Sequence, residues 1–199
     1  LGAPLATSST VEFMVQLENL DGEQALFSVS EASTGRAAVS LRVREGNVEF
    51  HVCSQPLIPP NGEPITVQVD ELYSTEPQHI AITLEFVRSA RGRAVYNASV
   101  YRNCELVTPS TLQVQDACYT LGNPVANLML PILGAQYSAR PQGFTSGSHA
   151  NAHIGDVRVW SRALPASEIC TRKQALLVGN ETGLEAYFPV SSTDVGLDK

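Results

Sequence analysis

The sequence has no run of about 18 consecutive apolar residues, the minimum length of a membrane-spanning helix, so we expect no such helix in this chain. It also has no basic segment followed by an apolar one at its start, so localisation has to be inferred from internal features. The chain has 199 residues, of which 43% are apolar and 17% are charged, and this is the composition of a soluble globular protein. We expect a single domain over residues 1–190, with residues 191–199 as a tail or the start of a linker.

Positive charge is scarce. Thirteen Lys and Arg residues stand against twenty Asp and Glu residues, which leaves a formal net charge of −7 at pH 7. A protein of this charge is repelled by other polyanions, so we expect neither nucleic acid nor an anionic membrane surface as its partner. A local basic face remains compatible with this balance, because it depends on where the arginines lie.

The cysteines include no Cys-x-x-Cys pair, and their wide spacing argues against a zinc site. Their even number favours two disulfides among Cys53, Cys104, Cys118 and Cys170. Four cysteines allow three pairings, and the residues alone do not choose between them. A hairpin that folds near Thr111 would place Cys104 opposite Cys118 and leave Cys53 with Cys170.

Two triplets match the acceptor pattern for N-glycosylation, Asn97-Ala-Ser99 and Asn180-Glu-Thr182. Together with the even cysteine count they predict a protein of the secretory pathway that is extracellular or at the cell surface. The alternative is that both triplets arise by chance and that the cysteines are free thiols in a cytosolic protein.

Apolar and polar residues alternate along much of the chain, as expected of strands with one buried face. Val11, Phe13, Val15 and Leu17 set the pattern, with Glu12 among the polar residues between them. Residues 39–43 and 48–52 repeat it around the turn Glu45-Gly46-Asn47, which predicts a hairpin. Further strands are expected at 65–70, 79–86, 93–102, 128–133, 154–160 and 184–190. About ten short strands separated by Gly, Pro and Ser turns predict an all-β, antiparallel two-sheet jelly-roll sandwich.

One short helix is expected near the C-terminus. Leu164-Pro165 would begin it with proline at the first helical position, and Glu168 would lie in its first turn, where the helix dipole favours an acid. We expect it to end near Leu176. Residues 55–64 and 137–151 read as long loops, which is where a sandwich usually carries its binding residues.

The stretch Gly155-Asp-Val-Arg-Val-Trp-Ser-Arg-Ala-Leu-Pro-Ala-Ser-Glu-Ile169 resembles the closing strand-to-helix signature of laminin-G-like and pentraxin-like jelly rolls. Shorter matches follow in the order of that family at 9–16, 79–83, 100–107, 133–135 and 183–188. The resemblance implies a concanavalin A-like fold and an extracellular module for adhesion or recognition. Trp160 is the single tryptophan, and because a lone tryptophan is more often a core residue than a platform for stacking a sugar, we expect it in the core.

The segment Tyr101-Arg-Asn-Cys104-Glu105, followed by Cys170 in the expected helix, is similar to the N-terminal domain of thrombospondins and related collagens. That resemblance implies a disulfide between Cys104 and Cys170, which leaves Cys53 with Cys118.

Acidic residues are missing from residues 134–155, the loop region in which pentraxins hold calcium. Because Ca²⁺ binds several charged oxygens, the sequence does not support a calcium site, and we predict no metal and no other cofactor. His149 and His153 have the spacing of a helical metal pair, but in a loop and a strand they would not face the same way. Glycosidases of this fold need two carboxylates about 5–9 Å apart, and no matching acidic alternation occurs, so we predict no enzyme.

We therefore expect a module of a larger secreted or cell-surface protein that binds a glycan or a protein. Its candidate contact residues lie around one expected strand connection and are Arg88, Arg91, Arg93 and Arg102. The alternative for these arginines is ordinary solubilising charge. The alternative for the whole chain is a structural or assembly domain without a dedicated ligand, and a glycoside-active enzyme of the same fold is less favoured.

Overall fold

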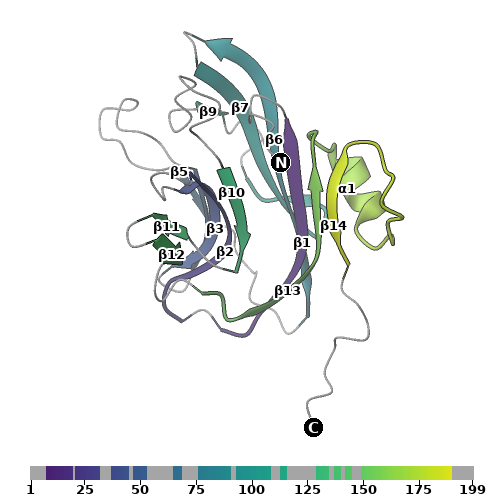
Figure 1. The fold of residues 1–199 in the computed structure, drawn as a ribbon. Coiled ribbons are helices and arrows are strands. Elements are labelled where there is room, and N and C mark those ends of the chain that lie inside the picture. Colours follow the sequence, from purple (N-terminus) through teal and green to yellow (C-terminus); the bar gives the residue numbers. More distant parts are fainter. Residues whose placement is uncertain are drawn as a thin grey trace.

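The structure is a computed structural model of the 199-residue chain. It describes residues 8–19, 21–31, 37–44, 47–52, 65–68, 76–90, 93–108, 113–115, 129–134, 137–139, 142–144 and 149–189. Within these ranges two antiparallel sheets face each other and one short helix lies outside them (Figure 1). None of the helical structure in this part of the chain is long and apolar enough to cross a membrane.

The larger sheet has seven strands. Its path runs β14 (Leu184–Phe188), β13 (Ala152–Trp160), β1 (Ser9–Leu17), β6 (Gln78–Ala90), β7 (Arg93–Arg102) and β8 (Glu105–Leu106), and β9 (Gln113–Gln115) also pairs with β7. The strand nearest the N-terminus thus lies between strands from the middle and the end of the chain, paired antiparallel with both. Such non-consecutive neighbours are typical of a jelly roll.

The smaller sheet has five strands. Its order is β10 (Met129–Leu133), β2 (Gln24–Glu31), β3 (Ala37–Arg44), β4 (Asn47–Val52) and β5 (Ile65–Gln68). β11 (Tyr137–Ala139) and β12 (Gln142–Phe144) form a separate hairpin beside it. The expected all-β two-sheet sandwich is confirmed.

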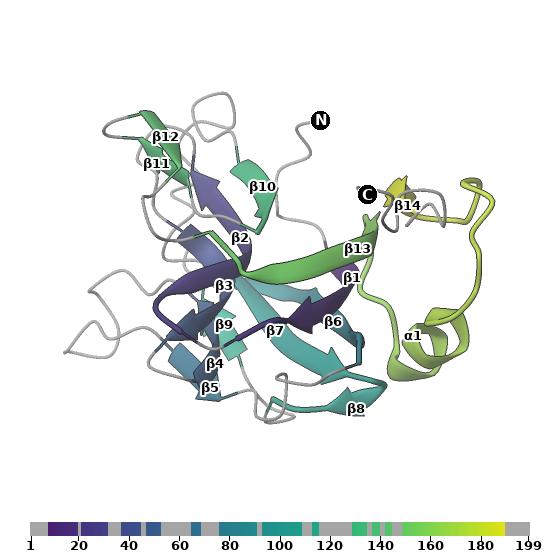
Figure 2. The same ribbon diagram turned by 90° about the horizontal axis from the view of Figure 1, so that it is seen from below.

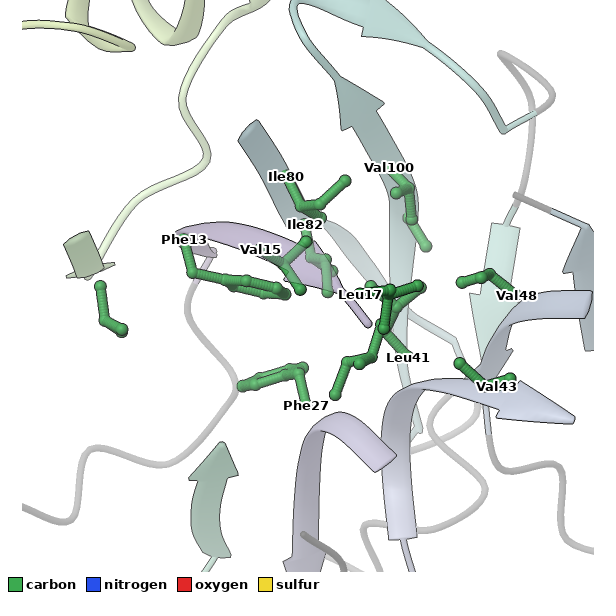
Figure 3. Packing of buried hydrophobic residues seen from close by; sticks show 13 residues of the cluster. Phe13, Val15, Leu17, Phe27, Leu41, Val43, Val48, Ile80, Ile82 and Val100 are labelled. Carbon is green, nitrogen blue, oxygen red and sulfur yellow. The ribbon is translucent and has the colours of Figure 1, made fainter. Parts of the chain in front are cut away.

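The main core lies between the two sheets (Figure 3). Phe13 and Val15 of β1 point towards Phe27 of β2 and Leu41 of β3, and the rings of Phe13 and Phe27 lie 6.2 Å apart between centroids. All four side chains are buried, as is Ile80 of β6. The alternation read from the sequence therefore identifies the inward face of β1 and β6 correctly, because side chains along a strand alternate between its two faces.

Most expected strands are present, and the hairpin of β3 and β4 closes with Arg44 opposite Asn47. Two details differ. β6 continues to Ala90, beyond the expected end at 86. Residues 137–151 were expected to be a loop, but they contain the short β11–β12 hairpin, so this prediction is wrong. The other expected loop, 55–64, lies outside the described residues. Three-residue strands are too short to show a periodic pattern, which explains the miss.

The helix α1 (Ala166–Arg172) is shorter than expected and lies on the face of the seven-stranded sheet away from the five-stranded sheet (Figure 2). Pro165 is its N-cap, with extended φ and ψ of −69° and 152°, so its expected position inside the helix is wrong by one residue. The expected end near Leu176 is also wrong. The guanidinium of Arg158 donates to the main-chain oxygens of Arg172 at 2.5 Å and Ala175 at 2.9 Å, which satisfies carbonyls at the helix end without another helical turn.

Candidate functional site

Of the four predicted contact arginines, the structure brings two together. Arg88 of β6 lies opposite Val95, and Arg93 begins β7 opposite Ala90, so both belong to the end of the β6–β7 hairpin. Arg102 ends β7 opposite Ile80, about 30 Å away from Arg93 at the usual rise of a strand. Arg91 lies outside the described residues. The four arginines therefore do not form one patch, because a continuous strand separates Arg102 from the hairpin end.

A β-bulge decides which face of the sheet the hairpin arginines occupy. Pairing is regular from Ile80 opposite Arg102 to Phe86 opposite Tyr96, and the register then shifts so that Arg88 lies opposite Val95. One extra residue in β6 reverses the alternation of the positions that follow it. Position 88 would face the core without the bulge. With it, positions 88 and 93 fall on the outer face of the sheet.

The outer face at this point also carries Asn97. Its neighbours Ala98 and Val100 are buried in the core, whereas Asn97 is half-buried and its Nδ2 donates to Oε2 of the exposed Glu85 at 3.2 Å. Diagonal neighbours on one face of an antiparallel pair are about 7–8 Å apart. Position 88 has this relation to both 93 and 97. We call Arg88, Arg93 and Asn97 the hairpin stripe.

The hairpin projects from the molecule. In Figure 1 the arrowhead of β6 ends beyond the five-stranded sheet, at the top of the view. The bulge residue Val87 is exposed. The hairpin stripe thus lies on an extension of the sheet whose outer face is not under α1.

The second predicted acceptor, Asn180, lies exposed in the loop between α1 and β14. The carboxylate of Glu181 organises this loop by accepting the main-chain N–H groups of Val178 at 2.8 Å and Gly179 at 2.9 Å. These bonds, that of Val178 first, lower the pKa of Glu181 below its usual range. Asn180 is therefore exposed and Asn97 half-buried, and they lie on different parts of the fold.

Cys104 and Cys170 lie side by side. Cys104 is in the turn between β7 and β8, where Asn103 and Cys104 have φ values of 47° and 80°. The Sγ of Cys170, on α1, lies 3.8 Å from the carbonyl oxygen of Cys104. Burial first, then a hydrogen bond with the thiol of Cys170, raises the pKa of Cys104 to about 11. Both are thiols in this structure, and Cys53 and Cys118 lie outside the described residues.

Beneath α1, the seven-stranded sheet holds a buried polar cluster that the sequence pattern does not reveal. Glu12 accepts a hydrogen bond from Nε1 of Trp160 at 2.6 Å, and its other carboxylate oxygen lies 3.1 Å from Nε2 of His79. The side chains of Glu12 and His79 are 0% and 1% exposed. Alternation places Glu12 on the outer face, as observed, but only α1 makes that face an interior. We call Glu12, His79 and Trp160 the seam cluster.

Charged side chains close the seam around Trp160, whose expected burial is confirmed. The guanidinium carbons of Arg172 and Arg162 lie 4.9 and 5.6 Å from the centre of its ring. Glu168 binds both arginines, and the hydrogen bond from Arg162 is the largest cause that lowers the pKa of this carboxyl. The seam is therefore a closed structural junction, in which Leu164 and Ile169 supply the apolar contacts.

Among the described residues, no group of three His, Cys, Asp or Glu side chains is placed to hold a metal ion. The two candidate histidines are in different settings. The backbone of His149 forms an isolated parallel β-bridge with Ala25 of β2. His153 lies in β13, and its Nε2 is 3.2 Å from a carboxylate oxygen of Glu18.

No protein-family model and no curated protein matches this sequence. Solved structures share its fold. A SAP-like pentraxin from Limulus polyphemus is 14% identical, with 83% of this chain and 69% of that chain covered and a TM-score of 0.55. A putative carbohydrate-binding protein from Bacteroides ovatus is 16% identical, with 92% and 45% covered and a TM-score of 0.54.

The CBM40 module of the Ruminococcus gnavus IT-sialidase, solved with α2,3-sialyllactose, is 13% identical, with 83% and 82% covered and a TM-score of 0.52. The chain spans less than half of the Bacteroides protein and most of the CBM40 module. At these identities the likeness is one of fold, and it places the chain among the concanavalin-like jelly-roll sandwiches expected from its sequence.

Proposed function

We propose that this chain is an extracellular recognition module that binds an anionic glycan through the end of its β6–β7 hairpin. The observation that carries the proposal is the register shift at Val87, which puts positions 88 and 93, both arginine, on one outer face of the sheet as diagonal neighbours. A CBM40 module of the same fold was solved with a sialyllactose, which supports glycan binding as a use of this architecture.

Arginine suits this role because its planar guanidinium forms paired hydrogen bonds with sulfate- or carboxylate-like groups. The chain as a whole is acidic, with a formal charge of −7, so attraction to a polyanion depends on a local concentration of positive charge. Contacts of this kind at the surface are screened by salt. Binding should therefore weaken steeply as the salt concentration rises.

Retention on a heparin column tests the proposal with protein made without N-glycans. The variant Arg88→Ala/Arg93→Ala should elute at clearly lower salt than the unsubstituted chain. The single variants Arg88→Ala and Arg93→Ala are compared with Arg102→Ala, which also removes one positive charge but at the other end of β7. Equal elution of the double variant and the unsubstituted chain would overturn the proposal. So would failure of the unsubstituted chain to bind.

A non-enzymatic, extracellular role belongs to the same proposal. The acid–imidazole pair of Glu12 and His79 is sealed beneath α1, which supports a structural use for it. The two acceptor triplets, with Asn180 exposed and Asn97 half-buried, and the adjacent Cys104 and Cys170 support passage through the secretory pathway. An active hydrolase in a screen of glycoside substrates would contradict the first point.

An assembly role is a second candidate, favoured by three exposed apolar side chains near the edge strand β14. Leu176, Val178 and Phe188 are 89%, 82% and 63% exposed. Exposed apolar groups of this kind often mark protein contacts. Light scattering separates the two functions: a stable oligomer that Leu176→Ser/Val178→Ser converts to monomer favours assembly, whereas a monomeric chain speaks against it.

A further inference from the structure

We propose that an N-linked glycan on Asn97 controls access to the hairpin stripe, so that the chain glycosylated there binds anionic glycans weakly and the chain without this glycan binds them tightly. The inference rests on the proposed function of Arg88 and Arg93. It adds a means of regulation at the same face, carried by the position of the acceptor asparagine.

The register places the acceptor next to the arginines. Asn97 lies opposite Glu85, and Arg88 lies opposite Val95, two positions from Asn97 along β7. Positions 88 and 97 are therefore diagonal neighbours on the outer face, about 7–8 Å apart. Without the bulge at Val87, position 88 would fall on the core face and a glycan at Asn97 would not adjoin it.

The local chemistry suits the modified state. In N-glycosylation the amide Nδ2 attacks C1 of the first sugar of a lipid-pyrophosphate-linked oligosaccharide. A C–N bond forms, the bond from C1 to the pyrophosphate breaks, and Nδ2 loses one proton. Nδ2 keeps its other hydrogen. That hydrogen can still donate to Oε2 of Glu85, which accepts from Asn97 Nδ2 at 3.2 Å in this structure.

A glycan held in this way lies over the sheet's outer face. It is bulky and strongly hydrated. Its first sugars stand close to Arg88, and a polyanion that approaches both arginines has to displace them. A glycan with acidic end groups would also bring negative charge to the face that carries positions 88 and 93 and weaken the attraction of a polyanion further.

The chain contains a matched control in Asn180. This residue is exposed in the loop that leads into β14, and β14 is separated from β7 by three strands of the same sheet. At the usual spacing the two strands are about 19 Å apart. A glycan on Asn180 changes the mass and hydration of the protein in the same way, but it does not adjoin the arginines.

The test uses the chain secreted from a glycosylating host, with occupancy of both asparagines measured by mass spectrometry. Ser99→Ala removes the acceptor triplet and keeps the Asn97 side chain, and Thr182→Ala does the same for Asn180. Thermal melts establish that the variants are folded. On a heparin column Ser99→Ala should elute at clearly higher salt than the glycosylated parent and at the same salt as the chain made without glycans. Thr182→Ala should match the parent.

The outcomes separate this inference from the proposed function. If Asn97 carries no glycan, or if the parent and Ser99→Ala elute together, the inference is wrong. The proposed function then still stands where Arg88→Ala/Arg93→Ala weakens binding of the unglycosylated chain. If that double variant has no effect, both fail. Equal gains in Ser99→Ala and Thr182→Ala would show a general effect of glycans and would also overturn the inference.

Discussion

Replacing Glu12 with alanine is expected to lower the free energy of unfolding by about 3–5 kcal/mol, because it leaves a buried donor without its acceptor and opens space beneath α1. The carboxylate of Glu12 accepts Nε1–H of Trp160 at 2.6 Å and lies 3.1 Å from Nε2 of His79. Without it, the buried Nε1–H of Trp160 loses its acceptor, at about 1–3 kcal/mol, and Nε2 of His79 loses the carboxylate that it faces. The space left by the side chain adds to that cost.

Glu18 and His153 provide the matched control, because they form the same pair of residue types at 3.2 Å but are 51% and 76% exposed. An exposed pair contributes little, so Glu18→Ala should change stability by less than about 0.5 kcal/mol. The loss of stability in Glu12→Gln should lie between those of Glu12→Ala and Glu18→Ala, since the amide oxygen of glutamine still accepts from Trp160. The difference between Glu12→Ala and Glu18→Ala then measures how much burial adds to the cost of removing the carboxylate.

Urea unfolding followed by the fluorescence of Trp160, the single tryptophan, measures all three variants. Far-UV circular dichroism on the same samples tests whether unfolding is two-state. With a slope of about 1–3 kcal/mol per molar urea, Glu12→Ala should lower the midpoint by at least about 1 M. A loss below about 1 kcal/mol, or a loss equal to that of Glu18→Ala, would refute the reasoning about the seam cluster.

Three further predictions concern the region around α1. Because the pKa of Glu168 is lower in the folded than in the unfolded protein, its carboxylate stabilises the fold above the usual carboxyl pKa of about 4.3, and this stability is lost as the pH falls through the pKa of the folded state. The difference in unfolding free energy between the unsubstituted chain and Glu168→Gln should therefore be large at pH 7 and shrink towards pH 3, as measured by urea titrations. Cys104 and Cys170 should form a disulfide in the secreted protein: alkylation should label neither without reductant, and reduction should cost about 2–4 kcal/mol. Labelling of both under oxidising conditions would contradict this. Gly183→Ala should destabilise by at least about 1 kcal/mol in thermal melts, because φ is +84° and a Cβ would lie 3.0 Å from Cδ of Arg162; an unchanged melting temperature would count against it.

Local pattern predicts much of this fold because the relevant information is periodic. In β1, the alternation of Phe13 and Val15 with polar residues is enough to identify the buried face, since successive side chains of a strand point to opposite faces. The strand-to-helix stretch that ends at Ile169 is recognisable by its resemblance to the closing signature of laminin-G-like and pentraxin-like jelly rolls, in which Pro165 marks the start of the helix. These features depend only on neighbours along the chain.

The candidate site is less predictable. That Arg88 and Arg93 lie near one strand connection follows from the sequence. That they share the outer face does not, because the register shift at Val87 depends on how β6 pairs with β7. The separation of Arg102 likewise depends on β7 being one unbroken strand.

Strand periodicity and turn residues are local properties, so the order of amino acids is enough to predict an all-β sandwich, the inward faces of its strands and a closing helix. That the outer face at Glu12 is an interior depends on how distant parts of the chain pack together. Glu12 is covered by α1 and by Trp160, which follow about 150 residues further along the chain. Nε1 of Trp160 donates a hydrogen bond to Glu12 across that distance in sequence. A polar residue in an alternating strand carries no local mark of what will later pack over it, since burial is set by the whole fold.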